Sequence, residues 1–325
     1  MKVTILGSGA YGIALALMFN KNNCDITIWE RFEDKAKDII KHRENKQVLP
    51  GVKIPDNIKI TSDLEDSIIG SELIVIAIPA GFVDEVTLKI KDIVSKEQHI
   101  CIASKGIEQD TCLFVDDVVR KYIKSKKIAV ISGPSFAVDI AKYVPIGLTI
   151  ASKCKKTIKV VKKGLENDTL KLRETDDMIG TEICGSIKNV MAIASGMLDG
   201  MGLPESTQAM FITESLHDIK ELIKALGGDG KTVLSFAGFG DLLLTCTSTK
   251  SRNFTFGKIL GEKRPKNEID NYIANTTIEG LYTLKSIHKL IKNKKVDIPI
   301  IDLVYDIVFN NENPEELKRF LITKK

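Results

Sequence analysis

Short apolar runs alternate with stretches of helical periodicity over roughly the first 175 residues of the chain. The runs with strand character cover residues 3–6, 26–29, 73–78, 99–103, 128–132 and 146–151. Strands that are apolar along their whole length and separated by helices are typical of a parallel sheet with helices on both faces. The pattern therefore predicts an α/β domain with a mostly parallel sheet at the N-terminus.

After about Thr175 the apolar positions recur with helical spacing, most clearly over residues 183–198, 209–226, 278–291 and 300–309. This change predicts two domains, residues 1–176 and residues 177–325, of which the second is all-α. The first long helix of that domain is rich in small residues, which favour close helix packing and a central, buried position. These residues are Gly185, Ser186, Ala192, Ala194, Ser195 and Gly196.

A glycine-rich loop follows the first apolar run, and an alanine-rich helix pattern follows the loop. Its glycines, Gly7, Gly9 and Gly12, form the motif G-x-G-x-x-G with Ala10 and Tyr11 inside it. In a Rossmann-like unit the first glycine permits the turn, the second lets the backbone approach a pyrophosphate, and the third lets the helix pack on the sheet. A chance match is the alternative, but the order strand, loop, helix, strand favours a dinucleotide bound at the helix N-terminus.

The second strand ends at Glu30, and Arg31 follows it. A carboxylate at this position can accept hydrogen bonds from an adenosine ribose and repels a 2′-phosphate, which favours NAD. An arginine can bind that phosphate, which favours NADP. The sequence leaves both cofactors open, with a slight preference for NAD.

Composition excludes several classes of protein. The 325 residues carry a net charge of +4, and the lysines are spread along the chain, so we expect no nucleic-acid partner. The six cysteines lack C-x-x-C spacing and the four histidines are scattered, so we expect reduced thiols, no metal site and a cytoplasmic location. No apolar run has the length of a membrane span.

Lys188 stands in the small-residue helix, between Ile187 and Asn189. A lysine in a helix usually lies at the surface. Here the neighbouring residues leave almost no polar face, so the side chain is expected to point into a polar cavity, where it can transfer a proton. We therefore favour a catalytic role for Lys188 over a structural one.

Two further polar segments occur downstream. Asp241 follows two glycines and opens a helical run, where it is either an N-cap or a site residue. Ser251, Arg252 and Asn253 then offer a hydroxyl, a cation and an amide in succession, a combination suited to phosphate oxygens. Each signal is weak alone.

Taken in order, these segments resemble the bacterial-type NAD(P)-dependent glycerol-3-phosphate dehydrogenases over nearly the whole chain. The matching segments also include residues 49–52, 104–108, 132–137, 187–190 and 278–280. The resemblance implies reversible reduction of dihydroxyacetone phosphate to sn-glycerol 3-phosphate, which supplies glycerophospholipid synthesis. It also implies a homodimer.

The resemblance assigns roles to individual residues. Lys188 corresponds to the residue that transfers the proton, and Lys105 to a residue where cofactor and substrate meet. The implied substrate-binding residues are Lys105, Gly133, Ser135, Lys188, Asp241, Ser251, Arg252 and Asn253. The implied cofactor-binding residues, beside the glycine loop and Glu30, are Ala10, Tyr11, Arg31, Lys105, Ala137, Arg252 and Glu279.

The chain departs from the family pattern at two places. Glu214 and Ser215 stand where this family commonly has Arg-Gly, and residues 80–82 lack a serine that is frequent after the proline. Either the ion pairs near Glu214 are rearranged or regulation differs. Other two-domain dehydrogenases, of the hydroxyacid or 6-phosphogluconate type, and a module that binds NAD without turnover remain as alternatives.

Overall fold

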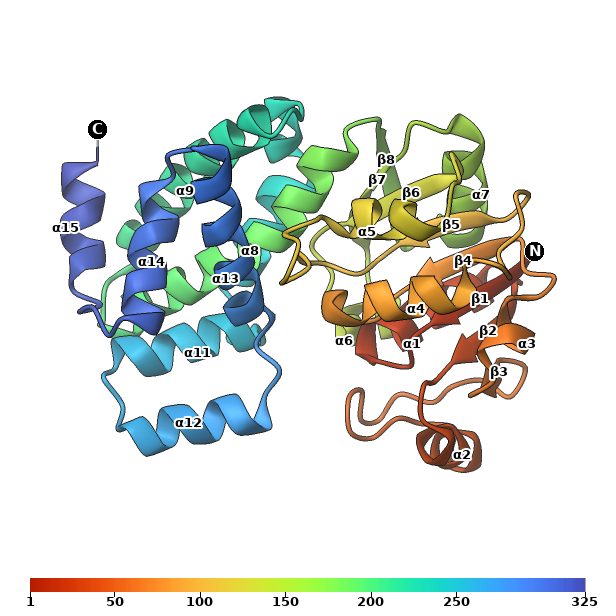
Figure 1. Ribbon diagram of the computed structural model, residues 1–325. Helices are drawn as coiled ribbons and strands as arrows, with labels where there is room; N and C mark the ends of the chain where they lie inside the picture. Colours follow the sequence, from red (N-terminus) through yellow and green to blue (C-terminus); the bar gives the residue numbers. More distant parts are fainter. Residues whose placement is uncertain (325) are drawn as a thin grey trace. The chain divides into compact units, whose positions relative to one another are not determined.

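The computed structural model describes residues 1–324, which form two compact units (Figure 1). The first unit consists of Met1–Lys105 and Val115–Met178, and the second of Gly106–Phe114 and the chain from Ile179 onward. An α/β domain with a mostly parallel sheet is followed by a helical domain, so the predicted fold class is confirmed.

The first unit alternates strands and helices. Its elements are β1 (Lys2–Leu6), α1 (Ala10–Lys21), β2 (Asp25–Trp29), α2 (Glu33–His42), β3 (Lys59–Thr61), α3 (Leu64–Ile68), β4 (Leu73–Ile76), η1 (Ala80–Phe82), α4 (Val83–Ile90), β5 (His99–Ile102), α5 (Val115–Tyr122), β6 (Ile128–Ser132), α6 (Ala137–Ala141), β7 (Ile146–Ala151), α7 (Lys155–Leu165) and β8 (Leu170–Thr175). All six predicted strands are present. The strands β3 and β8 were not predicted.

The sheet has the strand order β3-β2-β1-β4-β5-β6-β7-β8. Neighbouring strands are parallel, except that β7 runs antiparallel to β6. From β1 the next strands are added towards the β3 edge, and from β4 they are added towards the β8 edge. The strand order therefore reverses between β1 and β4. The carboxyl ends of strands at such a reversal are where open α/β sheets bind ligands.

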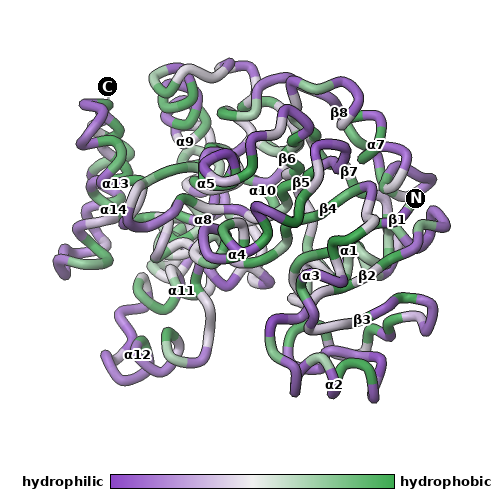
Figure 2. Tube along the Cα trace, turned by 45° about the vertical axis from the view of Figure 1, so that its right-hand side comes forward, coloured by the Kyte–Doolittle hydropathy of each residue, from purple (hydrophilic) through white to green (hydrophobic). Residues whose placement is uncertain are grey.

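Both faces of the sheet are buried. In β4, Leu73 and Val75 pack with α1 in the main core of this unit, while Ile74 and Ile76 are buried on the opposite face. Figure 2 shows the resulting apolar character along the central strands. The edge strand β8 instead alternates buried Leu170 and Leu172 with exposed charged residues, so no continuous apolar run marks it in the sequence.

The second unit consists of helices. They are α8 (Met178–Gly200), α9 (Glu205–Ala225), η2 (Gly230–Leu234), the π-helical turn η3 (Phe236–Gly240), α10 (Asp241–Cys246), α11 (Arg252–Gly261), α12 (Lys266–Asn275), α13 (Glu279–Lys294), α14 (Pro299–Phe309) and α15 (Glu316–Thr323). None of the helices within residues 1–324 combines the length and apolar character that a membrane crossing requires.

Helix α8 is the central element of the helical unit, as its small residues predicted. Residues from Ile183 to Leu198 contribute to the core, whereas α12 contains no buried residue and is largely hydrophilic in Figure 2. Glycines let the backbones of α8 and α11 touch. A Cβ atom on Gly196 would lie 2.0 Å from the carbonyl oxygen of Phe254, and one on Gly257 would lie 1.9 Å from that of Ile193.

We predict that Gly257→Ala lowers the free energy of unfolding by about 2–3 kcal/mol. The added methyl group would overlap the backbone of α8 at Ile193, and a backbone atom cannot rotate away as a side chain can. Urea unfolding monitored by circular dichroism measures the change.

Gly81→Ala is the matched control. A Cβ on Gly81 would meet no heavy atom within 4 Å among the described residues, and its φ does not lie in the left-handed region. The control should unfold like the wild type. Equal stability of the Gly257→Ala variant would show that the two helices can separate without cost.

Candidate functional site

The glycine loop of the first unit has no room for side chains at two of its positions. Gly7 has φ +121°, and a Cβ on it would lie 2.6 Å from the carbonyl oxygen of Ala77. A Cβ on Gly12 would lie 2.1 Å from the carbonyl oxygen of Gly7. The turn from β1 into α1 is therefore as tight as a dinucleotide-binding loop requires.

The start of α1 is suited to a phosphate group. Gly9 is the N-cap residue, and within the described part of the chain no side chain caps the helix there. A Cβ on Gly9 would meet no heavy atom within 4 Å among residues 1–324, so the backbone is open to a ligand. The first N–H groups of a helix lack intrahelical acceptors and attract anions. The loop thus fits a pyrophosphate on steric and electrostatic grounds.

Residues predicted for the cofactor and the substrate gather around Tyr11. Its hydroxyl lies 3.3 Å from the Ser135 hydroxyl, which donates to the carbonyl oxygen of Gly133 at 3.0 Å. The Lys105 ammonium lies 5.7 Å from the centroid of the Tyr11 ring. Ala137 begins α6, which packs on α1. These five residues, far apart in sequence, form one cluster in the first unit.

Glu30 and Arg31 face different partners at the end of β2. Glu30 is buried, and its carboxylate accepts hydrogen bonds from the Ser8 hydroxyl and, at 2.9 Å, from the backbone N–H of Phe32. Arg31 forms an ion pair with Glu85 of α4. The carboxylate is thus fixed next to the glycine loop, as a ribose-binding group should be.

A buried ion pair lies in the second unit. The Lys188 ammonium is 2.6 Å from an Asp241 carboxylate oxygen and donates to the Thr245 hydroxyl at 3.2 Å. The Lys188 side chain is 11% exposed and that of Asp241 only 1%. Burial of a charge is costly unless it is paired, so this pair holds both groups in a defined position.

The helix α10 places two of these groups one turn apart. Gly240 is its N-cap, so Asp241 is the first helical residue and does not cap the helix with its side chain. The Thr245 hydroxyl also donates to the Asp241 backbone carbonyl at 2.6 Å. Sequence reasoning missed Thr245, although its spacing of four residues from Asp241 on a helix is a usable signal.

Amide groups connect three helices beside Lys188. The Asn253 side chain donates to Asn189 at 3.0 Å and accepts from the Gly280 N–H at 2.8 Å. Asn189 in turn donates to the Glu279 carboxylate at 3.2 Å. Asn253 and Glu279 were predicted as ligand-binding residues, and both belong to this network. The connecting role of Asn189 was not predicted.

The other two residues of the Ser251–Asn253 segment lie at the start of α11. The Ser251 side chain caps the helix by accepting from the Phe254 N–H at 3.2 Å. Arg252 is exposed, and its carbonyl oxygen accepts from the Tyr272 hydroxyl at 3.1 Å. The guanidinium at a helix N-terminus adds a cation where an anion is already favoured.

Cys246 lies on the same helix as Asp241. Burial raises the pKa of the Cys246 thiol, which keeps it protonated at neutral pH. Within residues 1–324 no three side chains of His, Cys, Asp or Glu form a group that could hold a metal ion.

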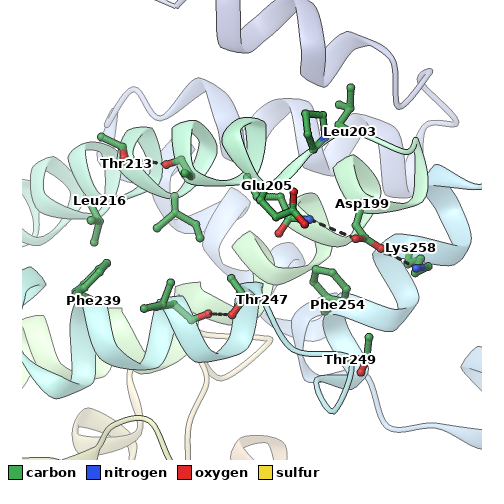
Figure 3. A pocket seen from close by; sticks show the side chains of 15 residues that line it. Asp199, Leu203, Glu205, Thr213, Leu216, Phe239, Thr247, Thr249, Phe254 and Lys258 are labelled. Carbon is green, nitrogen blue, oxygen red and sulfur yellow. Dashed lines mark hydrogen bonds and ion pairs between the residues drawn. The ribbon is translucent and has the colours of Figure 1, made fainter.

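A cavity of about 580 Å³ lies on the other side of α10 (Figure 3). Phe239, Leu243 and Thr247 line it, whereas Asp241 and Thr245 face Lys188. Its polar lining includes Asp199 and Lys258, whose charged atoms lie 2.8 Å apart. The cavity is therefore separate from the Lys188 ion pair.

The unusual Glu214 has a partner near the C-terminus. Its carboxylate lies 3.2 Å from the Lys324 ammonium, which also lies 2.7 Å from Asp218. Ser215 is buried and donates to the Phe211 carbonyl oxygen at 2.8 Å. The ion pairs around α9 are thus built for an acidic residue at position 214, since an arginine there would face Lys324.

Comparison with known proteins identifies both parts of the chain. Residues 2–158 match the family model of the NAD-dependent glycerol-3-phosphate dehydrogenase N-terminus, and residues 177–319 match that of the C-terminus. A glycerol-3-phosphate dehydrogenase [NAD(P)+] of Thermoanaerobacter sp. is 36% identical over 324 residues, which cover 100% of this chain and 97% of the relative. The corresponding Fusobacterium nucleatum protein is 34% identical over 97% of this chain and 95% of its own length.

A solved structure is similar over the same extent. The crystal structure of glycerol-3-phosphate dehydrogenase from Coxiella burnetii has a TM-score of 0.93 and 32% identity, and the match covers 99% of both chains. D-mandelate dehydrogenase, with a TM-score of 0.65 and 14% identity, shares the fold alone.

We predict that Asp241→Ala lowers the free energy of unfolding by about 3–5 kcal/mol, because it removes the carboxylate beside a buried ammonium. Adding Lys188→Met should restore part of the loss, since the buried charge is then absent. Urea unfolding of both single variants and the double variant measures the coupling.

Glu221→Ala is the control, because Glu221 pairs with Lys224 at 2.9 Å on the exposed side of α9. That variant should unfold like the wild type. If Asp241→Ala costs the same with and without Lys188, the two groups are not coupled.

Proposed function

The chain belongs to the NAD-dependent glycerol-3-phosphate dehydrogenase family, and we propose that Lys188 gives and takes the proton in its reaction. The protein is an NAD(P)-dependent oxidoreductase. The reaction is the reversible reduction of dihydroxyacetone phosphate to sn-glycerol 3-phosphate.

The buried pair of Lys188 and Asp241 is the observation that carries this proposal. A bound reduced nicotinamide supplies the hydride, which makes the C2 carbonyl oxygen of the substrate negative. An ammonium beside that oxygen stabilises the charge and donates its proton, so that a hydroxyl forms. The Asp241 carboxylate at 2.6 Å and the Thr245 hydroxyl at 3.2 Å restrict the ammonium to one orientation.

For the substrate phosphate we propose Arg252 as the neutralising cation. Its exposure at the start of α11 and the family resemblance support this role. Ser251 and Asn253 fix the orientation, although the Asn253 amide already has partners on Asn189 and Gly280. The resemblance adds Lys105, Gly133 and Ser135 as further substrate-binding residues.

For the cofactor, the tight loop and the open start of α1 support binding of the pyrophosphate at the glycine loop. By resemblance the cofactor-binding residues are Gly7, Gly9, Ala10, Tyr11, Gly12, Glu30, Arg31, Lys105, Ala137, Arg252 and Glu279. In this assignment residues 1–176 form the cofactor domain and residues 177–325 the substrate domain.

The cellular setting is proposed from the same family resemblance. It implies a homodimer in the cytoplasm that supplies glycerophospholipid synthesis. Six free cysteines, of which five are buried, suit a reducing compartment. Light scattering on the purified protein distinguishes a dimer from a monomer.

The decisive assay follows the absorbance of NADH or NADPH after addition of dihydroxyacetone phosphate. We expect oxidation of at least one of the two cofactors. Oxidation of neither would overturn the proposed activity and favour a protein that binds NAD without turnover.

We predict that Lys188→Ala and Lys188→Met each lower kcat by about 10²–10⁴-fold, because the proton donor is lost. Binding of NADH, followed by its fluorescence in the absence of substrate, should remain. This retained binding separates loss of chemistry from loss of folding.

Lys258→Ala is the matched control. Lys258 is also ion-paired with an aspartate in the helical unit, at 2.8 Å from Asp199, but it lies at the separate cavity. Its kcat should equal that of the wild type. Near-normal turnover of the Lys188 variants would refute the assignment.

A further inference from the structure

Glu85 of α4 holds the cation that follows β2. One guanidinium nitrogen of Arg31 lies 3.1 Å from one carboxylate oxygen of Glu85, and the second lies 3.2 Å from the other. This two-point geometry fixes the plane of the guanidinium as well as its position. Both side chains are about 40% exposed, at 40% for Arg31 and 39% for Glu85, so a ligand can reach them.

Aromatic rings hold the same guanidinium from other directions. Its central carbon lies 5.3 Å from the ring centroid of Phe82 and 5.7 Å from that of Phe32. Both rings are about half exposed. Arg31 is thus restrained by one carboxylate and two rings, and its side chain is not free to follow a ligand without giving up these contacts.

Lys89 also pairs with the Glu85 carboxylate and favours its ionised form. Its ammonium lies 2.7 Å from the Glu85 carboxylate, one turn along α4. The hydrogen bond from Lys89 and the charge of Arg31 hold the pKa of the Glu85 carboxyl below its usual value. At neutral pH the carboxylate is therefore ionised, and its negative charge is shared between Arg31 and Lys89.

Glu30, the residue before Arg31, carries a negative charge at the end of β2, where the adenosine of a cofactor would lie. Its carboxylate is buried and fixed by the Ser8 hydroxyl and the Phe32 N–H. A 2′-phosphate at this position would meet a fixed anion at Glu30 and a cation at Arg31 that is already paired. A free ribose 2′-hydroxyl would instead donate a hydrogen bond to the Glu30 carboxylate.

We propose that Glu85 is a specificity-determining residue that makes the enzyme prefer NADH to NADPH by occupying Arg31. This inference rests on the proposed function, since it concerns the cofactor of that reaction. Glu85 acts through Arg31 and is a positioning residue. Arg31 alone would favour a 2′-phosphate, and its pairing with Glu85 removes that advantage.

The test uses Glu85→Gln in the full-length protein and two probes, adenosine 2′,5′-bisphosphate and AMP, measured by titration calorimetry. The glutamine keeps the size of the side chain and removes its charge. We expect the bisphosphate to bind about two- to fivefold more tightly to the variant, the scale of one exposed charge contact, and AMP binding to stay unchanged. The ratio of kcat/KM for NADPH to that for NADH should rise by the same factor.

Two further variants make the test specific. Arg31→Gln combined with Glu85→Gln should lose the gain, because the gain depends on the released guanidinium. Glu97→Gln removes the same charge from a comparable pair, 2.9 Å from Lys127, and should leave both probes unaffected.

An unchanged preference for bisphosphate over AMP in Glu85→Gln would overturn the proposal. A gain that persists without Arg31 would also overturn it, because the effect would then come from Lys89 or from net charge. Binding of neither probe would do the same. These binding results are independent of turnover, so failure of the dehydrogenase assay is distinguishable from failure of this inference.

Discussion

The direct backbone contact between α8 and α11 is the constraint on which the helical unit depends. Glycines at the crossing, among them Gly196 and Gly257, leave no room for a single additional carbon atom. Because the helices touch there, the Asn189 and Asn253 amides at the adjoining turns come within hydrogen-bonding distance, and α13 joins them through Glu279. Lys188 is the neighbour of Asn189 on α8, so the same contact determines where its ammonium lies.

The ammonium could not occupy a buried position without α10. A lysine among Ile187, Val190 and Met191 would be strongly unfavourable if it had no charge partner. Asp241 and Thr245, one helical turn apart, supply a carboxylate and a hydroxyl. Leu242 and Cys246 of the same helix belong to the core, and Leu243 lines the separate cavity. One short helix thus has one face that pairs with Lys188 and another that lines the separate cavity.

The elements that the sequence predicts correctly are those that depend on residues close together in the chain. The six predicted strands, the alanine-rich helix after the glycine loop and the small-residue helix are all present, since each depends on periodicity within a few turns. The edge strand β8 was missed because only alternate residues are buried, and β3 because it has three residues. Residues 106–114 belong to the helical unit, although the segments before and after them have the alternating strand and helix pattern of the first unit. The pairing of Glu85 with Arg31 could not be predicted, because the two residues are 54 positions apart in the chain.

The meaning of a charged residue in this chain is set by its distant partner more than by its own position. Arg31 alone indicates affinity for a 2′-phosphate, but in the structure it is paired with Glu85, 54 residues away. Judged from its own segment, Lys188 is a lysine in a helix that has almost no polar face. Asp241, 53 residues away, stabilises it as a buried cation. Glu214 departs from the family pattern, and Lys324 compensates for the departure. Because a Coulomb interaction depends on distance in space, a motif identifies which charges are present but not which of them a ligand can use.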